Sequence, residues 1–195
     1  MLRFMARPAP AADTAQRILD VAERLVQTRG FNGFSYADIA EALDVTKASL
    51  HYHFPSKADL GRRLIERYEK TFLAALKGIA AAGAAPREQL KRYVRIYADV
   101  LRENRMCLCG MLASDYATLP KAMREEVKHF FDENERWLVG VLEQGRKSGS
   151  LEFKGPAVDL ARVIVGSLEG AMMLARSYGD ASRFDSAAER LIASI

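Results

Sequence analysis

Cysteine, proline and long apolar runs are scarce in this chain of 195 residues, and each scarcity excludes a class of protein. Two cysteines are too few for a disulfide-stapled scaffold, and six prolines with 13 glycines exclude a collagen-like or low-complexity chain. The longest stretches without charge, residues 78–86 and 106–114, fall far short of the roughly 20 apolar residues that span a bilayer. With 49% hydrophobic and 28% charged residues, the composition predicts a soluble globular protein.

The N-terminal segment MLRFMARPAPAAD lacks the continuous apolar core of a secretory signal, and Pro8 and Pro10 interrupt it. The sequence therefore predicts a cytoplasmic protein. In that compartment Cys107 and Cys109 are expected to stay reduced and not to form a structural disulfide. We expect residues 1–12 to form a flexible arm ahead of the first helix.

From residue 13 onward, apolar residues recur at the three- and four-residue spacing of amphipathic helices, without the alternation typical of strands. Glycines, prolines and small hydroxyl residues separate the periodic segments and mark their ends. The sequence therefore predicts an all-α fold of about nine helices. Their expected ranges are 13–30, 36–43, 47–54, 56–76, 86–101, 106–116, 120–145, 156–174 and 184–195.

Segments 36–43 and 47–54 are two short helices joined by a three-residue turn, with one helix before them and a long helix after them. This is the arrangement of a helix-turn-helix unit, in which the second short helix reads DNA. In that helix Leu50 and Phe54 are four residues apart and form the inward pair. The small, hydroxyl, cationic and polar aromatic side chains left for the outward face suit the major groove. They are Lys47, Ala48, Ser49, His51, Tyr52 and His53.

The formal net charge of +4 alone only permits a polyanionic partner, but its distribution says more. Residues 46–63 hold four cations against one acid. These charges are Lys47, Lys57, Arg62 and Arg63 against Asp59. The long helix that begins after Ser56 also directs free backbone N–H groups and its dipole outward, which attracts phosphate. The charge pattern therefore favours nucleic acid as the partner.

Residues 34–60, FSYADIAEALDVTKASLHYHFPSKADL, resemble the DNA-binding segment of the tetracycline-repressor-like (TetR) regulators. The resemblance extends over roughly residues 13–60, and the helical remainder fits the family in length and helix order. It implies a homodimeric, usually repressing, regulator with an N-terminal three-helix DNA-binding domain. A larger C-terminal domain would bind a small molecule and form the dimer. The corresponding boundaries are 13–55 for the helix-turn-helix domain and 56–195 for the effector-binding and dimerisation domain.

The resemblance also implies which residues contact a palindromic operator in double-stranded DNA. On the recognition helix they are Thr46, Lys47, Ser49, Tyr52 and His53. Ser35 and Tyr36 start the preceding helix, and Lys57 lies at the phosphate-binding start of the long helix. His51 stands where the family commonly has tyrosine.

Two segments, 120–147 and 156–178, are the best candidates for the large apolar face that a dimer needs. In the second segment Gly166, Gly170 and Ala171 permit a close approach of helices, so that two helices from each subunit form a four-helix bundle. The alternative is that one of these helices is buried within its own subunit.

Aromatic and methionine side chains on the middle helices supply the apolar walls and polar tips of an effector cavity, although they fit an ordinary core equally well. The expected lining residues are Phe72, Tyr93, Tyr97, Cys109, Met111, Tyr116, Phe130, Trp137, Met172 and Met173. A buried tyrosine hydroxyl or indole N–H seeks a partner, which a ligand can supply.

The pair Cys107 and Cys109 has three interpretations. The cysteines are small buried hydrophobes, or they are metal ligands, for which His129 is the only further soft ligand outside the DNA-binding helix. In the third interpretation, thiols near Arg105 and a helix N-terminus have a lowered pKa and sense electrophiles or oxidants. The sequence favours buried hydrophobes over a sensor, and a sensor over a metal site.

The sequence lacks the GxSxG, HExxH, phosphate-loop and dinucleotide motifs of enzymes, and a cysteine-dependent enzyme using His129 is a remote alternative. No cofactor or metal is expected. A helical interaction module that has lost DNA binding is expected to lack the set Lys47, Tyr52 and Lys57, which this chain retains. The predicted function is a DNA-binding transcriptional regulator, a homodimeric repressor that a small effector releases from its operator. The thiol-based alternative is release by electrophiles or oxidants through Cys107 and Cys109.

Overall fold

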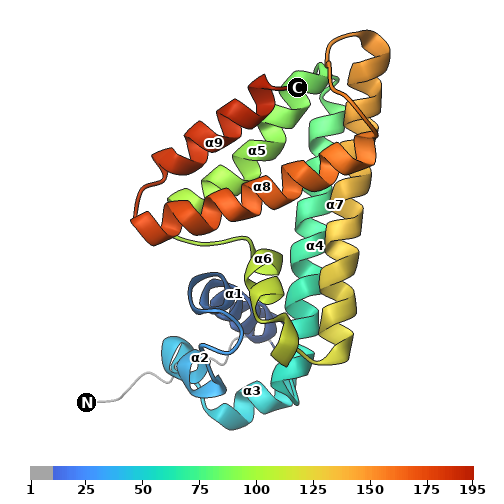
Figure 1. Ribbon diagram of the computed structural model, residues 1–195. Coiled ribbons are helices and arrows are strands. Elements are labelled where there is room, and N and C mark those ends of the chain that lie inside the picture. The colour runs from blue at the N-terminus through green and yellow to red at the C-terminus, as the bar shows by residue number, and fades with distance from the viewer. Residues whose placement is uncertain (1–10) are drawn as a thin grey trace, which may run out of the picture.

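The computed structural model describes residues 11–195, so the predicted arm at residues 1–12 lies almost wholly outside the described residues. The described part of the chain is all-helical, with nine α-helices and one 3₁₀ turn, which confirms the predicted fold class. Figure 1 shows a small three-helix unit at the lower end and a larger helical body above it, with the long helix α4 (Lys57–Ala81) running from one to the other.

The small unit consists of α1 (Ala11–Arg29), α2 (Tyr36–Leu43) and α3 (Lys47–His53). Ser35 starts α2 as predicted, because its Oγ accepts a hydrogen bond from the Ala37 amide at 3.2 Å and Asp38 completes a capping box. Thr46 caps α3 in the same way, since its Oγ1 accepts from the Ser49 amide at 3.2 Å. These caps hold the two short helices in the helix-turn-helix arrangement.

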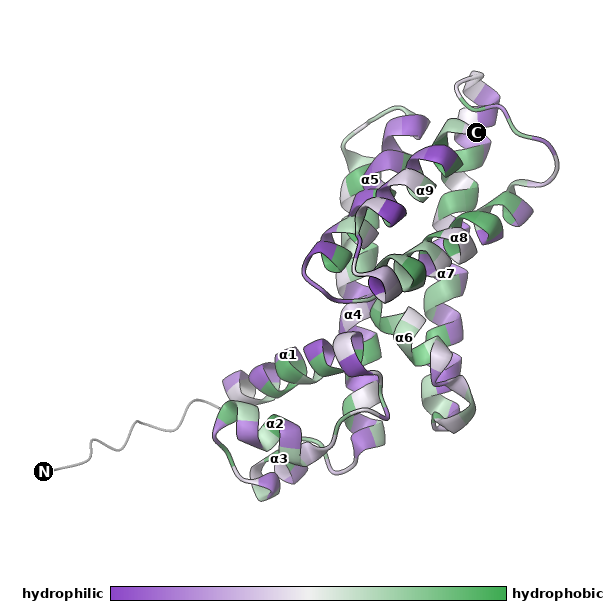
Figure 2. Cartoon of the chain, turned by 60° about the vertical axis from the view of Figure 1, so that its left-hand side comes forward, coloured by the Kyte–Doolittle hydropathy of each residue, from purple (hydrophilic) through white to green (hydrophobic). Residues whose placement is uncertain are grey.

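The body contains the remaining elements. They are α5 (Pro86–Arg102), α6 (Leu108–Ser114), the turn η1 (Tyr116–Thr118), α7 (Lys121–Ser148), α8 (Ala157–Tyr178) and α9 (Ser182–Ala193). In Figures 1 and 2, α4 and α7 run alongside each other, and α8 crosses α7 on its way to α9. With 25 residues α4 is about 37 Å long, so a small tilt of this helix in the body displaces the α1–α3 unit.

Several helix ends differ from the predictions because local caps decide them. The predicted helix 106–116 begins at Leu108, since the Cys107 sulfur accepts from the Gly110 amide at 3.4 Å, and it gives way to η1 after Asp115. Helix α8 continues past the predicted residue 174 to Tyr178, where Gly179 adopts a left-handed conformation with φ of 64°.

One connected hydrophobic core extends from the α1–α3 unit into the body. Tyr93, Phe130 and Phe184 are the largest of its fully buried side chains. Hydrophobic residues dominate α8 in Figure 2, whereas α4 and α7 alternate between hydrophobic and hydrophilic residues. None of the helices within residues 11–195 combines the length and the apolar character needed to cross a membrane.

Candidate DNA-binding surface and effector site

The outer face of α3 forms the candidate DNA-binding surface. Leu50 is fully buried and Phe54 is buried at the end of the helix, so the predicted inward pair anchors α3 to the core. The Tyr52 side chain projects into solvent and is 80% exposed. The residues exposed beside it are Lys47, Ala48 and His51. Since α3 lies at the lower end of the molecule in Figure 1, away from α5, α8 and α9, this face is free to enter a major groove.

Neighbouring groups orient the rings on this surface. The Tyr52 ring packs edge-on against His53, with 5.1 Å between the centroids. The His51 ring lies 4.8 Å from the Tyr36 ring, and its Nδ1 lies 3.2 Å from the Pro55 carbonyl oxygen. These contacts limit ring rotation, so α3 presents its polar groups in a defined arrangement and loses less side-chain entropy on binding.

Tyr36, which the resemblance assigns to the DNA contact, is buried in the described structure. Its hydroxyl donates to the Phe54 carbonyl oxygen at 2.8 Å and thereby joins the start of α2 to the end of α3. Burial raises the pKa of Tyr36 to about 12, and the negative charge of Asp59 adds to this effect. The residue therefore holds the two short helices together.

Lys57, which the resemblance assigns to a phosphate contact, is half-buried and bonds to the loop between α1 and α2. Its Nζ donates to the carbonyl oxygens of Phe31 and Phe34, both at 2.5 Å, and lies 4.6 and 4.1 Å from the centroids of the same two rings. Partial burial lowers the pKa of the Lys57 ammonium, against the opposing charges of Asp115 and Asp38. The ammonium is thus turned inward, where it holds the loop between α1 and α2.

The same loop is bound to the body by residues around α6. The Asp115 carboxylate accepts from the backbone amides of Phe31 at 2.7 Å and Asn32 at 3.3 Å. The Asn32 side chain donates to Thr118 Oγ1 at 2.7 Å. At the end of α1, Arg176 of α8 donates to the backbone carbonyls of residues 27 and 28. Polar contacts therefore connect the helix-turn-helix unit to both α6 and α8.

Five of the predicted effector residues meet in one aromatic cluster in the body, which also contains Tyr68 of α4. The five are Phe72, Tyr93, Tyr97, Phe130 and Trp137. Tyr93 stacks on Trp137 with 5.6 Å between centroids, and its hydroxyl lies 3.1 Å from that of Tyr97. The prediction omitted Tyr68, whose ring is 5.6 Å from Phe130.

Three other predicted lining residues lie away from this cluster. Tyr116 is exposed on η1, where the Arg124 guanidinium lies over its ring. Met111 packs near Gly30 and Arg176 at the boundary with α1. Met173 is 56% exposed on α8, whereas Met172 and Cys109 are fully buried. Tyr116, Met111 and Met173 therefore lie outside the aromatic cluster, because helical spacing alone did not give the face on which each lies.

Two polar residues of this core were not predicted: Glu169, which is partly exposed but has a buried Oε1, and the buried Asn134. Glu169 on α8 packs against Gly110 of α6, where there is no room for a larger side chain. Burial raises the pKa of Glu169 to about 7, and a hydrogen bond from the Cys107 thiol partly opposes this rise. Asn134 on α7 is 1% exposed, and neither of its amide atoms has a hydrogen-bond partner in the described structure. Both positions share a helix face with buried apolar residues, a signal that was present in the sequence.

The cysteines do not have the reactive character that the sensor interpretation requires. Cys107 and Cys109 are buried free thiols. Burial, together with the negative charge of Glu169, raises the pKa of both thiols well above the ordinary value. The predicted lowering of the pKa is therefore wrong, since Arg105 donates to Gln27 and Glu103 instead. His129, the further metal ligand considered, lies 3.6 Å from Glu69.

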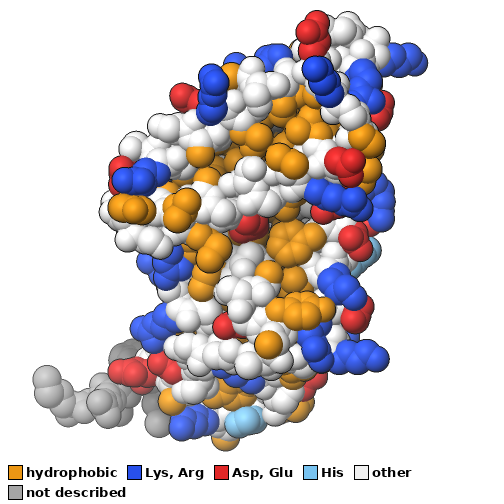
Figure 3. All heavy atoms as spheres, viewed as in Figure 1, with side chains coloured by type: hydrophobic (Ala, Val, Ile, Leu, Met, Phe, Trp, Pro, Cys, Tyr) orange, Lys and Arg blue, Asp and Glu red, His pale blue; other side chains and the backbone are white. Residues whose placement is uncertain are grey.

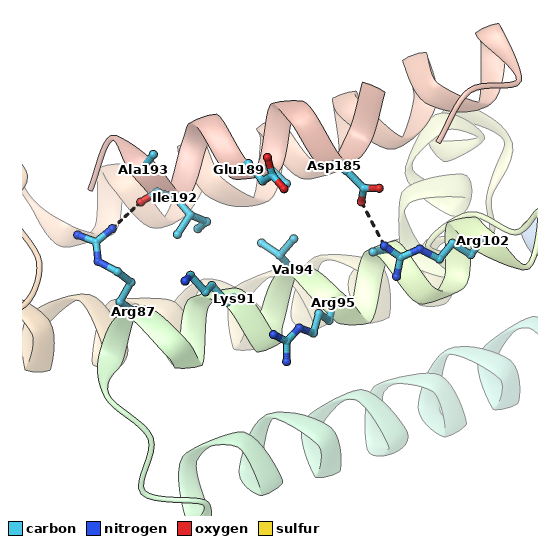
Figure 4. A pocket seen from close by; sticks show the side chains of 11 residues that line it. Arg87, Lys91, Val94, Arg95, Arg102, Asp185, Glu189, Ile192 and Ala193 are labelled. Carbon is cyan, nitrogen blue, oxygen red and sulfur yellow. Dashed lines mark hydrogen bonds and ion pairs between the residues drawn. The ribbon is translucent and has the colours of Figure 1, made fainter. Parts of the chain in front are cut away.

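A groove of about 550 Å³ lies between α5 and α9 (Figure 4). Val94 and Ile192 contribute to its apolar floor. Arg87 donates to the carbonyl oxygens of Ile192 and Ile195 at 2.9 and 2.6 Å, and Arg102 pairs with Asp185 at 3.4 Å. These charged residues join the two helices at the rim, and the predicted effector residues lie elsewhere.

Comparison with known proteins agrees with this geometry. The family described as bacterial regulatory proteins of the tetR family matches residues 18–64, and a tetracyclin repressor-like C-terminal domain matches residues 86–191. A TetR-family regulator from Agrobacterium tumefaciens is 33% identical, with a TM-score of 0.92 over 95% of this chain and 99% of that one. A TetR regulator from Legionella pneumophila is 35% identical, with a TM-score of 0.86 over 97% and 100% of the two chains.

Among the relatives, the HTH-type transcriptional repressor NemR of Escherichia coli is 25% identical over 172 residues, which cover 84% of each chain. The family matches together span the helix-turn-helix unit and most of the body. They also confirm the prediction that the chain is a transcriptional regulator and not an enzyme. The chain therefore belongs to the tetR family and is a DNA-binding transcriptional regulator with a C-terminal effector domain.

Proposed function

We propose that this regulator acts as a homodimeric repressor that binds a palindromic operator through α3 and leaves it when a small effector binds the body. In this scheme residues 13–55 read DNA, and residues 56–195 bind the effector and form the dimer. The observation that carries the proposal is the exposed face of α3, where Lys47 and the 80% exposed Tyr52 project from a helix anchored by Leu50. Lys47 would contact phosphate, and Ser49 and Tyr52 would contact base edges.

The outer face of α8 supports dimerisation. Val163, Met173, Leu174 and Tyr178 are between 54% and 64% exposed on this one helix. Figure 3 shows hydrophobic side chains gathered over this part of the body. Such a strip is unusual on a monomer and typical of an interface. The outer side of α7 is mostly charged by comparison, with Lys128, Asp132 and Arg136 among its exposed residues, so α8 is the principal helix of the proposed interface.

The space beside the glycines of α8 supports the same interface. A methyl group added at Gly166 or Gly170 would meet no other atom of the chain within 4 Å. These positions therefore leave room for a second helix to approach closely, and small residues at helix contacts permit such an approach. In a two-fold dimer the two copies of α8 would cross near these glycines.

Release from DNA would depend on the contacts between the body and the α1–α2 loop. An effector that binds one arrangement of α4 and α6 more tightly than another shifts the dimer between two states. The DNA-binding state requires the two α3 helices to lie roughly 34–36 Å apart, or a multiple of that, so that both enter the same face of the duplex. Asp115 holds the loop from the α6 side and is positioned to transmit such a shift.

The thiol-based alternative has less support. A cysteine sensor reacts as the thiolate, and burial disfavours the thiolate of both Cys107 and Cys109. A protein with Cys107→Ser and Cys109→Ser tests this alternative directly. If electrophiles release the wild-type protein from DNA and fail to release this variant, the thiol mechanism is supported over the small-effector one.

Selection of bound sequences from a random DNA pool tests the central proposal. We expect a palindrome whose half-sites are about one helical turn apart, recovered by the full-length protein in gel-shift assays. Tyr52→Ala is expected to reduce discrimination between this palindrome and random DNA. Recovery of no common sequence, or equal losses on specific and random DNA, would contradict the assignment of α3 as the reading helix.

Sedimentation of a charged variant tests the dimer. Leu174→Arg places a charge in the α8 strip and is expected to give a monomer with weakened operator binding. Tyr116→Arg is the matched control, because Tyr116 is also an exposed aromatic residue but lies on η1, outside the strip. A dimeric Leu174→Arg protein would exclude this face as the interface.

A further inference from the structure

Glu169 is a partly buried residue whose carboxyl group has no counter-ion among the described residues. Its Oε1 is buried and has no hydrogen-bond partner in the described structure, and the Cys107 thiol donates to the same carboxyl group. The titratable groups that interact with it are tyrosines and cysteines, whose ionised forms are negative. Among the described residues, no lysine, arginine or histidine forms an ion pair with it. A buried carboxylate in such surroundings is stable only with a positive partner.

Asn134 supplies a second unpartnered polar group in the same domain core. It is 1% exposed on α7, and both its Oδ1 and its Nδ2 are unpaired. Phe130 and Trp137 lie one turn away on either side of it, so its amide faces the aromatic cluster. Because buried amides are otherwise nearly always hydrogen-bonded, this one indicates a site for a polar group of a ligand.

The aromatic cluster neighbours both polar groups, because Tyr93 and Tyr97 interact with the charge of Glu169 and Asn134 lies one turn from Phe130 and Trp137. Tyr93 stacks on Trp137, and Phe72 lies edge-on to Phe130 at 5.1 Å between centroids. The faces of such rings attract cations and the edges do not. The Tyr93 and Tyr97 hydroxyls, 3.1 Å apart, add polar tips to the same cluster.

A cleft between α1, α4 and α5 reaches these rings from outside. Tyr68 and Phe72 line its inner end, and Gln27, Ile96 and Val100 are among its other lining residues, together with the charged Glu23 and Arg105. Tyr68 in turn contacts the Cys107 thiol that donates to Glu169. The cleft measures about 190 Å³, which is below the roughly 300–1,000 Å³ of sites for drug-sized ligands. The route therefore favours a compact molecule.

We propose that the effector is a compact molecule carrying a protonated amine, which binds the Glu169 carboxylate while its apolar part packs against the rings of the cluster. This inference rests on the proposed effector-controlled function and names the chemical class of the effector. The ammonium donates to Glu169, the Asn134 oxygen accepts a further N–H, and the ring faces stabilise the charge.

Two other ligand classes fit these groups less well. An anionic ligand would add a second negative charge next to Glu169, and the arginine that lines the cleft, Arg105, is already paired with Glu103. A neutral alcohol can donate one hydrogen bond to the carboxylate, but it brings no charge. A matched series on one carbon skeleton therefore separates the three classes.

The experiment titrates the full-length protein with 2-phenylethylamine, 2-phenylethanol and phenylacetate at pH 7.5. Trp137 is the only tryptophan of the chain and stacks within the cluster, so its fluorescence reports binding there. We expect saturable binding of the amine, about tenfold or more tighter than that of the alcohol, as a charge-assisted hydrogen bond implies. Binding of phenylacetate is expected to be weaker than that of either. Equal affinities for amine and alcohol, or no saturable amine binding, would overturn the proposal.

Glu169→Gln is expected to remove the preference for the amine and leave the affinity for the alcohol within about twofold. The matched control is Glu189→Gln, because Glu189 is an exposed glutamate on α9 beside the surface groove. Loss of amine binding in this control would place the ligand in that groove and overturn the proposal. Asn134→Leu, an apolar replacement at a buried position, is a second test and is expected to weaken amine binding several-fold.

Circular dichroism and operator gel shifts accompany each titration. If Glu169→Gln fails to fold, the wild-type ligand series and Asn134→Leu still decide between the classes. Operator binding without any amine binding would refute the inference and leave the proposed function intact. Failure of the wild-type protein to select any operator would instead refute the proposed function.

Discussion

Replacing Glu169 with glutamine is expected to make the free energy of unfolding less dependent on pH. Burial raises the pKa of Glu169 from 4.5 to about 7, and the hydrogen bond from Cys107 opposes part of the rise. In the unfolded chain the carboxyl group titrates near its ordinary value. The difference between the folded-state and unfolded-state pKa values of Glu169 corresponds to about 3 kcal/mol in the free energy of unfolding, since each pKa unit is worth 1.36 kcal/mol.

The sign follows from the order in which the two states lose the proton. Below pH 4.5 the carboxyl group is protonated in both states, so its titration has no effect on stability. Between pH 4.5 and about 7 the unfolded state has lost the proton and the folded state keeps it, so the free energy of unfolding falls as the pH rises. Above pH 7 the group is ionised in both states, and the full cost of the buried charge remains.

The measurement is urea unfolding at several values between pH 5 and pH 8, at one protein concentration and without ligand. The free energy of unfolding of Glu169→Gln minus that of the wild type is expected to rise across this range by about 2.5 kcal/mol. A constant offset from the buried amide does not affect this slope. Glu189→Gln is the control and is expected to give a flat difference. A flat or falling difference for Glu169→Gln would refute this reasoning. It would show that the carboxyl group is either solvated or paired with a positive group.

The remaining predictions concern the ligand and the DNA-binding unit. Because the amine requires an ionised Glu169, its affinity in the wild-type protein is expected to rise about tenfold between pH 6 and pH 8, measured by Trp137 fluorescence. Lys57→Met removes two hydrogen bonds to carbonyl oxygens and is expected to cost about 1–3 kcal/mol in thermal unfolding, with the salt dependence of DNA binding unchanged. Lys47→Met is expected to do the reverse, reducing the slope of log affinity against log salt by about 1 without changing stability. Tyr36→Phe is expected to destabilise the protein by about 1 kcal/mol and to leave operator discrimination intact, in contrast to Tyr52→Ala.

The helices of this protein could be predicted from the sequence because local rules define them. Apolar spacing gave the segments, and Ser35, Thr46 and Ser56 were identified as caps from the hydroxyl that each offers to the following turn. Leu50 and Phe54 were correctly placed inward because they lie four residues apart. These features depend on neighbours within a few residues, which a sequence displays directly.

The directions of individual side chains could not be predicted in the same way. Tyr36 and Lys57 stand at positions that the resemblance assigns to DNA, yet each bonds to a backbone carbonyl of a distant residue. The carbonyls that accept these bonds depend on how α1, α2 and α4 pack. Tertiary packing likewise separated Met111 and Tyr116 from the aromatic cluster, because α6 is short and ends before η1.

Glu169 shows why the candidate effector site was only partly predicted. Aromatic and methionine residues were predicted to line the site, and five of the predicted aromatic residues form the cluster. Glu169, the residue behind the proposed preference for a cationic ligand, lies on the inner face of α8. It is three residues before the buried Met172 and four after the buried Val165. A single charge at such a position is more informative than the apolar residues around it, because burying it without a partner is costly.

The packing around α6 also connects this acid to DNA binding. Gly110 lies directly against Glu169, and Asp115, which follows the same short helix, accepts the amides of Phe31 and Asn32. Lys57 binds the carbonyls at both ends of that loop from α4. A ligand that binds Glu169 must therefore act on a helix already bonded to the α1–α2 loop. Only four residues, 111–114, separate Gly110 from Asp115, so even a small shift of α6 reaches the unit that carries α3.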